Sequence, residues 1–455
     1  MEDLGVQLDI LGRGTGLFKL YTQLCLCFDN SNGPSQSETV DILTNGLELL
    51  AASFPWVAGQ VVNTEPDGKA ESYRIVPHEK IPRLVIKDLR DSLSMDTLRQ
   101  ANFPSSMLDE SVVAPINTLA AGTEGPAPVF AVQANLVKGG LLLTFVTQHN
   151  TMDMTGMAQV MNLLSLACRG DPFTVEELRI GNLDRHNLIP LLDEDYTPGP
   201  ELDRQIAKIP THATVENALG EGPDTSSPPH CSWTYFVFSG IALAVLKSIA
   251  TISLASKTQY VSTDDVLSAF IWQAVTKARL SRLNPAEETT FARATDPRRY
   301  LDIPASYPGL VQNMTYATYN LGQIVKEPLG AIASELRTGV DPKTSNLGYA
   351  TRALTTWFHR AEDKSNINVT ATLDLSKDIM LSSWAKYDCY DLEFNLGLGK
   401  PEAVRRPQFT PVESLFYLMP KRPDGEIAAA LCLRDEDLER LKGDAEFMRY
   451  AVYVG

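Results

Sequence analysis

Signatures of several common enzyme chemistries are missing from this chain of 455 residues. It has no G-x-S-x-G elbow to present a nucleophilic serine, and no G-x-x-x-x-G-K-[ST] loop to hold phosphates. The G-x-G-x-x-G fingerprint of dinucleotide-binding folds is also absent. Serine-hydrolase chemistry of the elbow type, P-loop phosphoryl transfer and Rossmann-type cofactor binding are therefore excluded.

Paired cysteines are missing as well. The six cysteines are scattered, without a C-x-x-C pair and without histidines at zinc-ligand spacing: Cys25, Cys27, Cys168, Cys231, Cys389 and Cys432. None of them stands in a setting typical of a papain-like nucleophile. We therefore expect neither a disulfide framework nor a bound metal.

Long apolar runs and a strong basic patch are missing too. No apolar segment reaches the ~18 residues of a membrane span, and the acidic start M-E-D-L-G does not resemble a secretory signal. The formal net charge of −16 disfavours binding to nucleic acid, and the nearest basic cluster is Lys400 to Arg406. We expect a soluble, cytoplasmic protein without membrane insertion and without a nucleic-acid partner.

The length favours two domains, because a single core rarely grows beyond roughly 250–300 residues. Residues 212–230 are rich in glycine, proline, serine and acidic residues, which is typical of a linker. We therefore predict an N-terminal domain at 1–211 and a C-terminal domain at 231–455.

Strands and helices alternate along both halves, which indicates an α/β fold. We expect strands at 20–28, 129–137, 141–147 and 233–238, with a hairpin turn at 138–140. We expect helices at 36–53, 155–169, 240–255 and 261–279. On the first helix Leu43, Leu47, Leu49, Leu50 and Phe54 would form one face, Thr155 would cap the second helix, and Thr263 or Asp264 the last.

The stretch that follows the strand at 141–147 carries the clearest chemical signal. His149 stands at the strand exit and Asp153 follows four residues later, in the pattern H-x-x-x-D. A histidine at a strand exit is either a satisfied core residue or a reacting group at the floor of a cleft. Asp153 can point away and anchor the turn through an arginine. Because no protein nucleophile is apparent, the pattern suits a base that acts between two bound substrates.

A second informative stretch covers residues 381–407. Gly397 and Gly399 flank Leu398 just before Lys400-Pro401. Glycines at this spacing indicate a sharply shaped loop, since glycine adopts backbone conformations that other residues disfavour. The loop is either a plain structural turn or part of a binding site.

Five elements in this order resemble the BAHD acyltransferases. They are the H-x-x-x-D of His149 to Asp153, the S-T-x-D-x-L-x-A-x-x-W of Ser262 to Trp272, the D-x-R of Asp296 to Arg298, the S-W of Ser383-Trp384, and G-K-P at 399–401. Segments such as P-W-V-A-G-Q-V (55–61) and Y-P-G-L-V-Q-N-M-T-Y (307–316) are most similar to the fungal trichothecene 3-O-acetyltransferases.

The resemblance implies two similar-sized domains of mixed sheet flanked by helices, as in chloramphenicol acetyltransferase, with a channel between them. His149 would be the general base, taking the proton of an acceptor alcohol as it attacks an acyl-CoA thioester. Asp153 would be structural and paired with Arg298. The helix after the turn could pack closely because of Gly156. Acetyl-CoA would be the co-substrate, a small-molecule alcohol the acceptor, and the protein a monomer.

The family's second motif, D-F-G-W-G, is altered here to Glu393-Phe394-Asn395-Leu396-Gly397. Glu393 would keep the structural acid, and Asn395 would still make the turn because asparagine tolerates left-handed backbone. The resemblance also assigns residues to the cofactor: Ser262, Thr263, Ser382, Ser383, Lys400, Arg405 and Arg406. Trp384 and Asn313 would line the acyl or acceptor pocket, with a core position as the alternative for Trp384.

Three functions remain open at this point. The first is O-acetylation of a fungal secondary metabolite such as a trichothecene-like sesquiterpenoid. The second uses the same scaffold on another acceptor, a polyketide alcohol or an amine. The third is a scaffold that binds or cyclises a metabolite without acyl transfer, as the altered motif at 393–397 allows.

Overall fold

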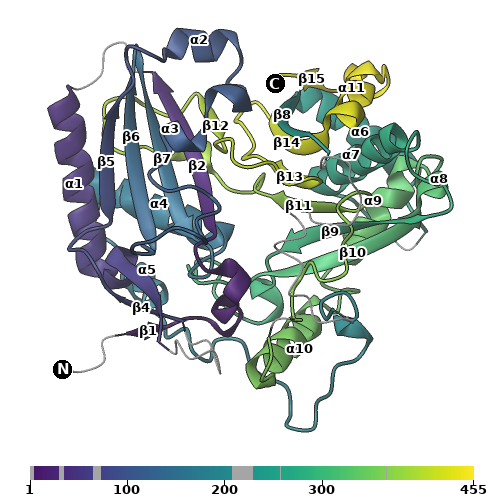
Figure 1. Cartoon of the computed structure of the whole chain (residues 1–455), viewed down its shortest axis with the longest axis horizontal. Coiled ribbons are helices and arrows are strands. Elements are labelled where there is room, and N and C mark those ends of the chain that lie inside the picture. Colours follow the sequence, from purple (N-terminus) through teal and green to yellow (C-terminus); the bar gives the residue numbers. More distant parts are fainter. Residues whose placement is uncertain (1–4, 30–34, 65–72, 208–228, 257, 365) are drawn as a thin grey trace.

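Two large β-sheets lie side by side in the described part of the protein, each covered by helices (Figure 1). The structure is a computed structural model and describes residues 5–455 except 30–34, 65–72, 208–228, 257 and 365. The predicted linker at 212–230 falls almost entirely outside the described residues. Within the described part of the chain, no helix is both long and apolar enough to span a membrane.

The first sheet has five strands in the order β12-β2-β7-β6-β5. They are β2 (Tyr21–Asp29), β5 (Arg83–Asp88), β6 (Phe130–Val137), β7 (Gly140–Gln148) and β12 (Ala403–Arg405). Every residue of β6 and β7 is buried. The antiparallel hairpin between them turns at Gly139, which adopts a φ of 74°. The predicted strands at 20–28, 129–137 and 141–147 are confirmed within one or two residues.

Helices α1 (Gln36–Ser53) and α4 (Met154–Arg169) pack together against this sheet, where both were predicted. The N-cap of α4 is Asp153 and not Thr155, because one oxygen of the Asp153 carboxylate accepts the Gly156 N–H. On α1, Leu43, Leu47 and Leu50 are buried as expected, whereas Leu49 is 49% exposed. The predicted apolar face was therefore one residue too wide.

The second sheet has seven strands in the order β10-β9-β11-β13-β14-β8-β15. They are β8 (Cys231–Phe238), β9 (Glu288–Thr295), β10 (Asn313–Asn320), β11 (Ile379–Ser383), β13 (Leu415–Leu418), β14 (Ile427–Arg434) and β15 (Val452–Tyr453). Helices α6 (Gly240–Ile252), α7 (Thr263–Arg279), α9 (Leu329–Thr338) and α11 (Asp435–Gly443) pack on it. The N-cap of α7 is Ser262, which forms a capping box with Asp265, so neither predicted cap is correct.

Shorter elements complete the fold. A small sheet of order β1-β4-β3 comprises β1 (Val6–Gln7), β3 (Gly59–Asn63) and β4 (Tyr73–Pro77). The remaining helices are α2 (Met95–Gln100), α3 (Glu110–Val113), α5 (Val175–Gly181), α8 (Leu321–Ile324) and α10 (Leu347–Arg360). Helix α10 packs beneath the second sheet and contacts β10.

The chain crosses from the second sheet back to the first after β11. The side chains of Tyr390, Phe394 and Val404 are buried in the same core as the residues of β2 and β7. Strand β12 then pairs with β2, with Val404 opposite Leu26. The predicted domain 231–455 is therefore not one spatial unit, because its segment 384–410 completes the first half. The division at 212–230 itself stays a prediction.

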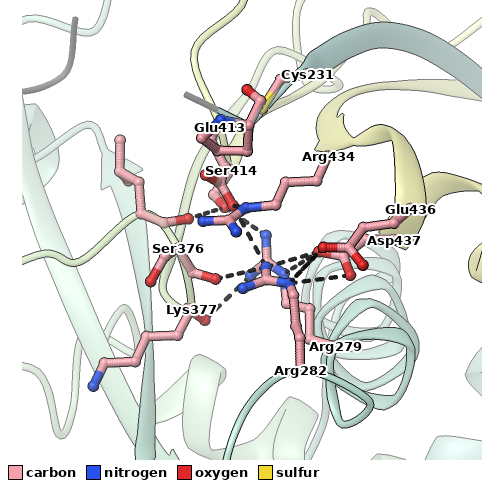
Figure 2. Close-up of polar contacts among 12 residues, drawn as sticks. Cys231, Arg279, Arg282, Ser376, Lys377, Glu413, Ser414, Arg434, Glu436 and Asp437 are labelled. Atoms are coloured by element: carbon pink, nitrogen blue, oxygen red, sulfur yellow. Dashed lines mark hydrogen bonds and ion pairs between the residues drawn. The ribbon is translucent and has the colours of Figure 1, made fainter. Parts of the chain in front are cut away.

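A buried polar cluster joins α11 to α7 and to the loop before β13 (Figure 2). Arg282 lies 2.7 Å from Asp437 and Arg434 lies 2.7 Å from Glu413. Arg279 has no exposed surface, and it donates to the carbonyl of Lys377 and to the Ser414 hydroxyl. This cluster is part of the second half and far along the chain from the H-x-x-x-D turn.

Candidate active site

His149 follows the last residue of β7. Its backbone N–H donates to the Leu20 carbonyl at 2.8 Å, and its Nδ1 lies 3.3 Å from the Met152 carbonyl oxygen. Only a protonated Nδ1 can donate to a carbonyl, so this contact leaves Nε2 with a free lone pair. Burial lowers the pKa of the imidazole below its ordinary value, although the side chain keeps some accessible surface. Its uncharged form therefore predominates near neutral pH, with Nε2 ready to accept a proton.

Asp153 locks the turn that follows His149. One carboxylate oxygen accepts the Gly156 N–H at 3.0 Å. The other accepts from Arg298 Nη2 at 2.8 Å and from the Val311 N–H at 2.9 Å. The predicted pair with Arg298 is confirmed, and the carboxylate makes two further bonds, because it also caps α4 and accepts the Val311 N–H.

Arg298 is 1% exposed and is saturated with acceptors. Besides Asp153, it donates to Asp296 at 2.9 Å and to the carbonyl of Gly309 at 2.7 Å. Burial alone would lower the pKa of this guanidinium, but the two carboxylates raise it above its ordinary value. Arg298 also lowers the pKa of Asp296 to about 2, against the opposing effect of burial. The raised pKa of Arg298 and the lowered pKa of Asp296 both favour the charged forms of this pair.

The loop before β10 lies directly against the start of α4. A Cβ atom on Gly156 would come within 2.0 Å of the Pro308 carbonyl oxygen. Any larger residue would push this loop away from the turn, and Arg298 donates to the carbonyls of Tyr307 and Gly309 in the same loop. The expectation that Gly156 permits close packing is confirmed.

Two buried residues near the turn were not anticipated. Asp9 accepts from the Tyr307 hydroxyl at 2.6 Å and lies 3.5 Å from Arg185. Arg185 donates to the Thr151 carbonyl at 2.5 Å and its guanidinium carbon lies 4.3 Å from the centre of the Trp56 ring. Burial raises the pKa of Asp9. No local pattern marks either residue, because their partners lie far away in the sequence.

The segment after β11 also contacts the turn. The Tyr387 hydroxyl lies 2.7 Å from Thr155 Oγ1, and Lys386 Nζ lies 2.9 Å from Asp296. These residues belong to the stretch 381–407, for which the sequence predicted no contact with the turn. Both halves of the protein therefore hold the residues around His149.

The structure brings together several residues that were assigned to the coenzyme. Ser383, the last residue of β11, donates its hydroxyl to Asp264 in the first turn of α7. Ser262 caps that helix, with its Oγ 3.1 Å from the Asp265 N–H, and Thr263 follows as its first residue. Ser382 Oγ instead accepts from the Trp384 indole at 3.0 Å. The end of β11 and the start of α7 thus form one polar patch.

Arg405 does not occupy a position suited to an anionic coenzyme. It is 3% exposed, and it donates to the backbone carbonyls of Phe103 at 3.1 Å and Asn102 at 3.3 Å. A side chain so placed stabilises the contact between β12 and the loop after α2. The prediction for Arg405 is wrong. Arg405 is the last residue of β12, and because this strand joins the edge of the first sheet, the guanidinium points into the protein.

Asn313 also departs from its predicted place in a pocket wall. It has no exposed surface, its carbonyl oxygen accepts from Gln205 Nε2 at 2.5 Å, and its amide donates to Thr351 at 3.0 Å. These bonds tie β10 to α10. Trp384 is 2% exposed and lies 4.8 Å from the Tyr417 ring, measured between ring centres, so it is a core residue.

The altered motif at 393–397 still forms a turn, with left-handed backbone at Asn395 and Gly397. Asn395 adopts a φ of 57°, as predicted, and Gly397 a φ of 65°. The Glu393 side chain is exposed, while its backbone carbonyl accepts from Ser165 Oγ at 2.7 Å and from Arg169 at 3.1 Å. The expectation that the Glu393 carboxylate is a structural acid is therefore not met. Lys400, also exposed, lies 2.6 Å from Asp391.

Among the described residues, no three histidine, cysteine or acidic side chains are grouped so that they could hold a metal ion. The charged groups of the turn, Asp153, Arg298 and Asp296, are bonded to one another and to backbone, whereas the buried side-chain amides of Gln148 and Asn150, which flank His149, have no hydrogen-bond partner in the described part of the chain. The site thus consists of one neutral imidazole on a rigid turn.

Comparison with known proteins extends these observations. Residues 20–168 match the family profile of the trichothecene 3-O-acetyltransferase-like N-terminal domain, and residues 102–448 match the Transferase family. The chain is 50% identical to the O-acetyltransferase dmxR13 of Cryptosporiopsis sp., over 100% of this chain and 98% of that protein. It is 48% identical to the trichothecene 3-O-acetyltransferase of Fusarium sporotrichioides, over 100% and 98%.

Solved structures agree with these relatives. The crystal structure of F. graminearum TRI101 complexed with coenzyme A and T-2 mycotoxin has a TM-score of 0.92 and 46% identity, covering 99% of this chain and 100% of that one. Vinorine synthase shares the fold, with a TM-score of 0.67 at 16% identity, covering 99% of this chain and 94% of that one. The protein therefore belongs to the Transferase family of BAHD acyltransferases, with the two-domain fold of that family.

Proposed function

We propose that this protein transfers an acetyl group from acetyl-CoA to a hydroxyl of a trichothecene-like sesquiterpenoid, with His149 as the general base. The observation that carries the proposal is the neutral imidazole at the end of β7, whose Nδ1 is held by the Met152 carbonyl so that Nε2 is free. The full-length similarity to trichothecene 3-O-acetyltransferases of two fungal genera supports the acceptor class.

In this mechanism His149 Nε2 takes the proton of the acceptor hydroxyl as the oxygen attacks the thioester carbonyl carbon. A new C–O bond forms and the carbonyl oxygen becomes an oxyanion. Collapse of the tetrahedral intermediate breaks the C–S bond, and the departing thiolate takes the proton back from the imidazolium. Asp153 and Arg298 hold the turn, because the carboxylate is bonded to the guanidinium and to two backbone N–H groups and is not available to the substrate.

The polar patch between β11 and α7 is our candidate for the coenzyme side of the site. Ser262, Thr263 and Ser383 lie there, and a hydroxyl that bonds an internal acid can still accept a further hydrogen bond. Lys400 is exposed in the segment between β11 and β12, and breaking its contact with Asp391 would cost little because both side chains are solvated. It remains the best placed of the predicted cations for a phosphate.

A second acceptor class has one specific observation in its favour. The relative that shares 50% identity is named only as an O-acetyltransferase, and a 34% identical relative from Monascus ruber as an O-acyltransferase. The same catalytic turn could therefore serve another metabolite alcohol. Acceptor choice depends on side chains around the turn and not on His149 itself.

The protein is proposed to act as a monomer in the cytoplasm. All six cysteines lie in the described part of the chain and none is in a disulfide, which fits a reducing compartment. Sedimentation velocity of the purified protein tests the first point, and a fluorescent fusion in fungal cells tests the second.

The test of function is incubation with acetyl-CoA and either deoxynivalenol or a panel of polyketide alcohols, with free thiol and acetylated product both measured. His149→Ala should lower kcat by ~10²–10⁴ while leaving the unfolding temperature unchanged, because the side chain acts in the reaction and makes one weak hydrogen bond. His230→Ala is the matched control, since that histidine is exposed and pairs with Asp435. Turnover by His149→Ala close to that of the parent would remove His149 from the mechanism.

A further inference from the structure

Arg406, the residue after β12, is a buried cation without an acid partner. Its side chain is 4% exposed, and within the described residues it forms no ion pair. Its Nη2 donates to Thr118 Oγ1 at 3.2 Å and its Nη1 to the Pro407 carbonyl at 3.3 Å. Its Nε has no hydrogen-bond partner. A buried guanidinium bonded only to neutral oxygens keeps its full charge inside the protein.

The surroundings of Arg406 compensate this charge only in part. The guanidinium carbon lies 3.8 Å from the centre of the Phe409 ring and 4.9 Å from that of Tyr417, and such contacts attract a cation weakly. The buried acid on α3, Glu110, accepts from the Thr118 N–H at 2.6 Å and from Gln23 at 2.8 Å. Its carboxylate therefore serves the neighbours of Arg406 and not Arg406 itself.

A cavity of about 10 Å³ adjoins the guanidinium, between Arg406, Trp233 and Thr234. The indole N–H of Trp233 and the hydroxyl of Thr234 lack partners, as does Arg406 Nε. This space holds about one water molecule. A single water can solvate the guanidinium but cannot neutralise it.

Backbone hydrogen bonds fix Arg406 relative to His149. Thr118, which accepts from Arg406, also accepts the Tyr21 N–H at its carbonyl at 2.8 Å. The preceding residue, Leu20, accepts the His149 N–H at 2.8 Å. Two consecutive residues before and in β2 therefore carry the arginine on one side and the imidazole on the other. Of these residues only Tyr21 lies in a strand, and the hydrogen bonds connect the Arg406 side chain through Thr118 to the segment that also holds the His149 backbone.

We propose that Arg406 is a positioning residue that holds His149 in its neutral, proton-accepting form. A nearby cation disfavours protonation of the imidazole, since protonation would place two positive charges in one buried region. The proposal rests on His149 being the general base. The proposal explains why a positive charge is buried at Arg406, which takes no part in the hydrogen bonds of Asp153 and Arg298.

The charged groups around His149 act on it in opposite directions. Burial lowers the pKa of the imidazole most, the Met152 carbonyl and the Asp153 carboxylate raise it, and Arg406 lowers it. Asp153 already faces Arg298, which limits how far it can favour the imidazolium. Removing the charge of Arg406 should therefore raise the pKa of His149. The acid limb of the pH–rate profile should then move to higher pH.

The test uses Arg406→Met, because an apolar side chain of similar length can replace a buried cation without loss of folding. The pKa of His149 is measured by NMR in protein labelled at histidine, with the His149 signal identified by its loss in His149→Ala. We expect this pKa to rise by on the order of half a pH unit, and the acid limb of kcat/KM to rise with it. Arg406→Lys keeps the charge and should leave the pKa near that of the parent.

Arg405→Met is the matched control. Arg405 is equally buried and adjacent in sequence, but its guanidinium bonds to backbone carbonyls of the loop after α2, whereas that of Arg406 bonds to Thr118. This variant should lose stability without changing the pKa of His149. If Arg406→Met leaves that pKa unchanged, or if Arg405→Met raises it as much, the proposal is wrong. Should Arg406→Met not fold, Arg406→Gln is judged by the same criterion.

The titration separates this inference from the proposed function. It needs no turnover, so it gives a result even if a variant has lost activity. A parent protein that does not acetylate any alcohol would contradict the proposed function. An unchanged His149 pKa in an active parent and its Arg406→Met variant would contradict only the role of Arg406.

Discussion

Two buried arginines, Arg298 beside the catalytic turn and Arg279 beneath α11, face aspartates in very different ways. Arg298 has carboxylate oxygens at 2.8 and 2.9 Å from two separate acids. Arg279 has its nearest carboxylate, that of Asp437, at 3.5 Å, and Arg282 takes the closer place on the same acid at 2.7 Å (Figure 2). One cation is shared by two acids, and one acid is shared by two cations.

The difference appears in the pKa of each guanidinium. Burial lowers the pKa of Arg279 to about 10, because Asp437 and Glu413 do not make up for the lost hydration and Arg282 opposes its charge. The pKa of Arg298 is raised despite equal burial, because Asp153 and Asp296 outweigh it. The charge of the arginine beside the H-x-x-x-D turn is therefore more fully compensated than that of the arginine beneath α11.

The largest expected effect on stability is that of Asp153→Ala. It leaves Arg298 with one acid in place of two and removes the cap of α4, and breaking a buried pair typically costs ~3–5 kcal/mol. Urea unfolding should show a lower midpoint than the parent. Asp296→Ala is the control, because its carboxylate is 23% exposed and Asp153 would remain. Equal midpoints for Asp153→Ala and parent would mean that the acid is not structural.

Arg279→Met should have a smaller effect, with a change in unfolding free energy within about 1.5 kcal/mol and in either direction. The substitution removes the free-energy cost of burying the Arg279 charge, and Asp437 stays paired with Arg282. The matched variant Arg298→Met should cost more, since it strands the buried Asp153. Urea unfolding of both variants measures the contrast directly. Equal losses would contradict the distinction drawn between the two arginines.

The smallest effect is expected for Glu393→Gln, within about 0.5 kcal/mol, because an exposed carboxylate away from a buried partner contributes little. Thermal unfolding is a sufficient measurement here. Ser165→Ala is the informative comparison, since it removes the hydroxyl that donates to the Glu393 carbonyl and should cost about 1 kcal/mol. A marked loss in Glu393→Gln alone would restore the acid to the structural role that the motif suggested.

The strands and helices near the H-x-x-x-D turn could be predicted closely, because their apolar pattern is local. The helix at 36–53 and the strand at 141–147 required only the spacing of apolar residues. The N-caps of the helices were harder to predict. Thr155 was expected in place of Asp153, and Thr263 or Asp264 in place of Ser262. A side chain with two acceptor oxygens can cap a helix and bind an arginine at once.

The contacts around the turn could be predicted where each partner stands in a recognisable motif, and they were missed where burial decides how a side chain points. His149, Asp153 and Arg298 follow from the order of the family's motifs. Arg405 and Arg406 read alike in the sequence, as adjacent basic residues beside a loop, yet both point into the protein because β12 joins the first sheet. Asp9 and Arg185 gave no signal, since their meeting depends on segments about 175 residues apart in the chain.

Strand β12 has a consequence for the synthesis of the protein on the ribosome. Its partner β2 ends at Asp29, and β12 begins at Ala403, so one edge of the first sheet lacks its neighbour until nearly the whole chain has been made. At about 5–20 residues per second this interval is roughly 20–75 s. During that time β2 presents unpaired backbone groups, which attract other strands. Premature termination before residue 403 should therefore release a fragment that aggregates through β2, even though it contains the complete catalytic turn.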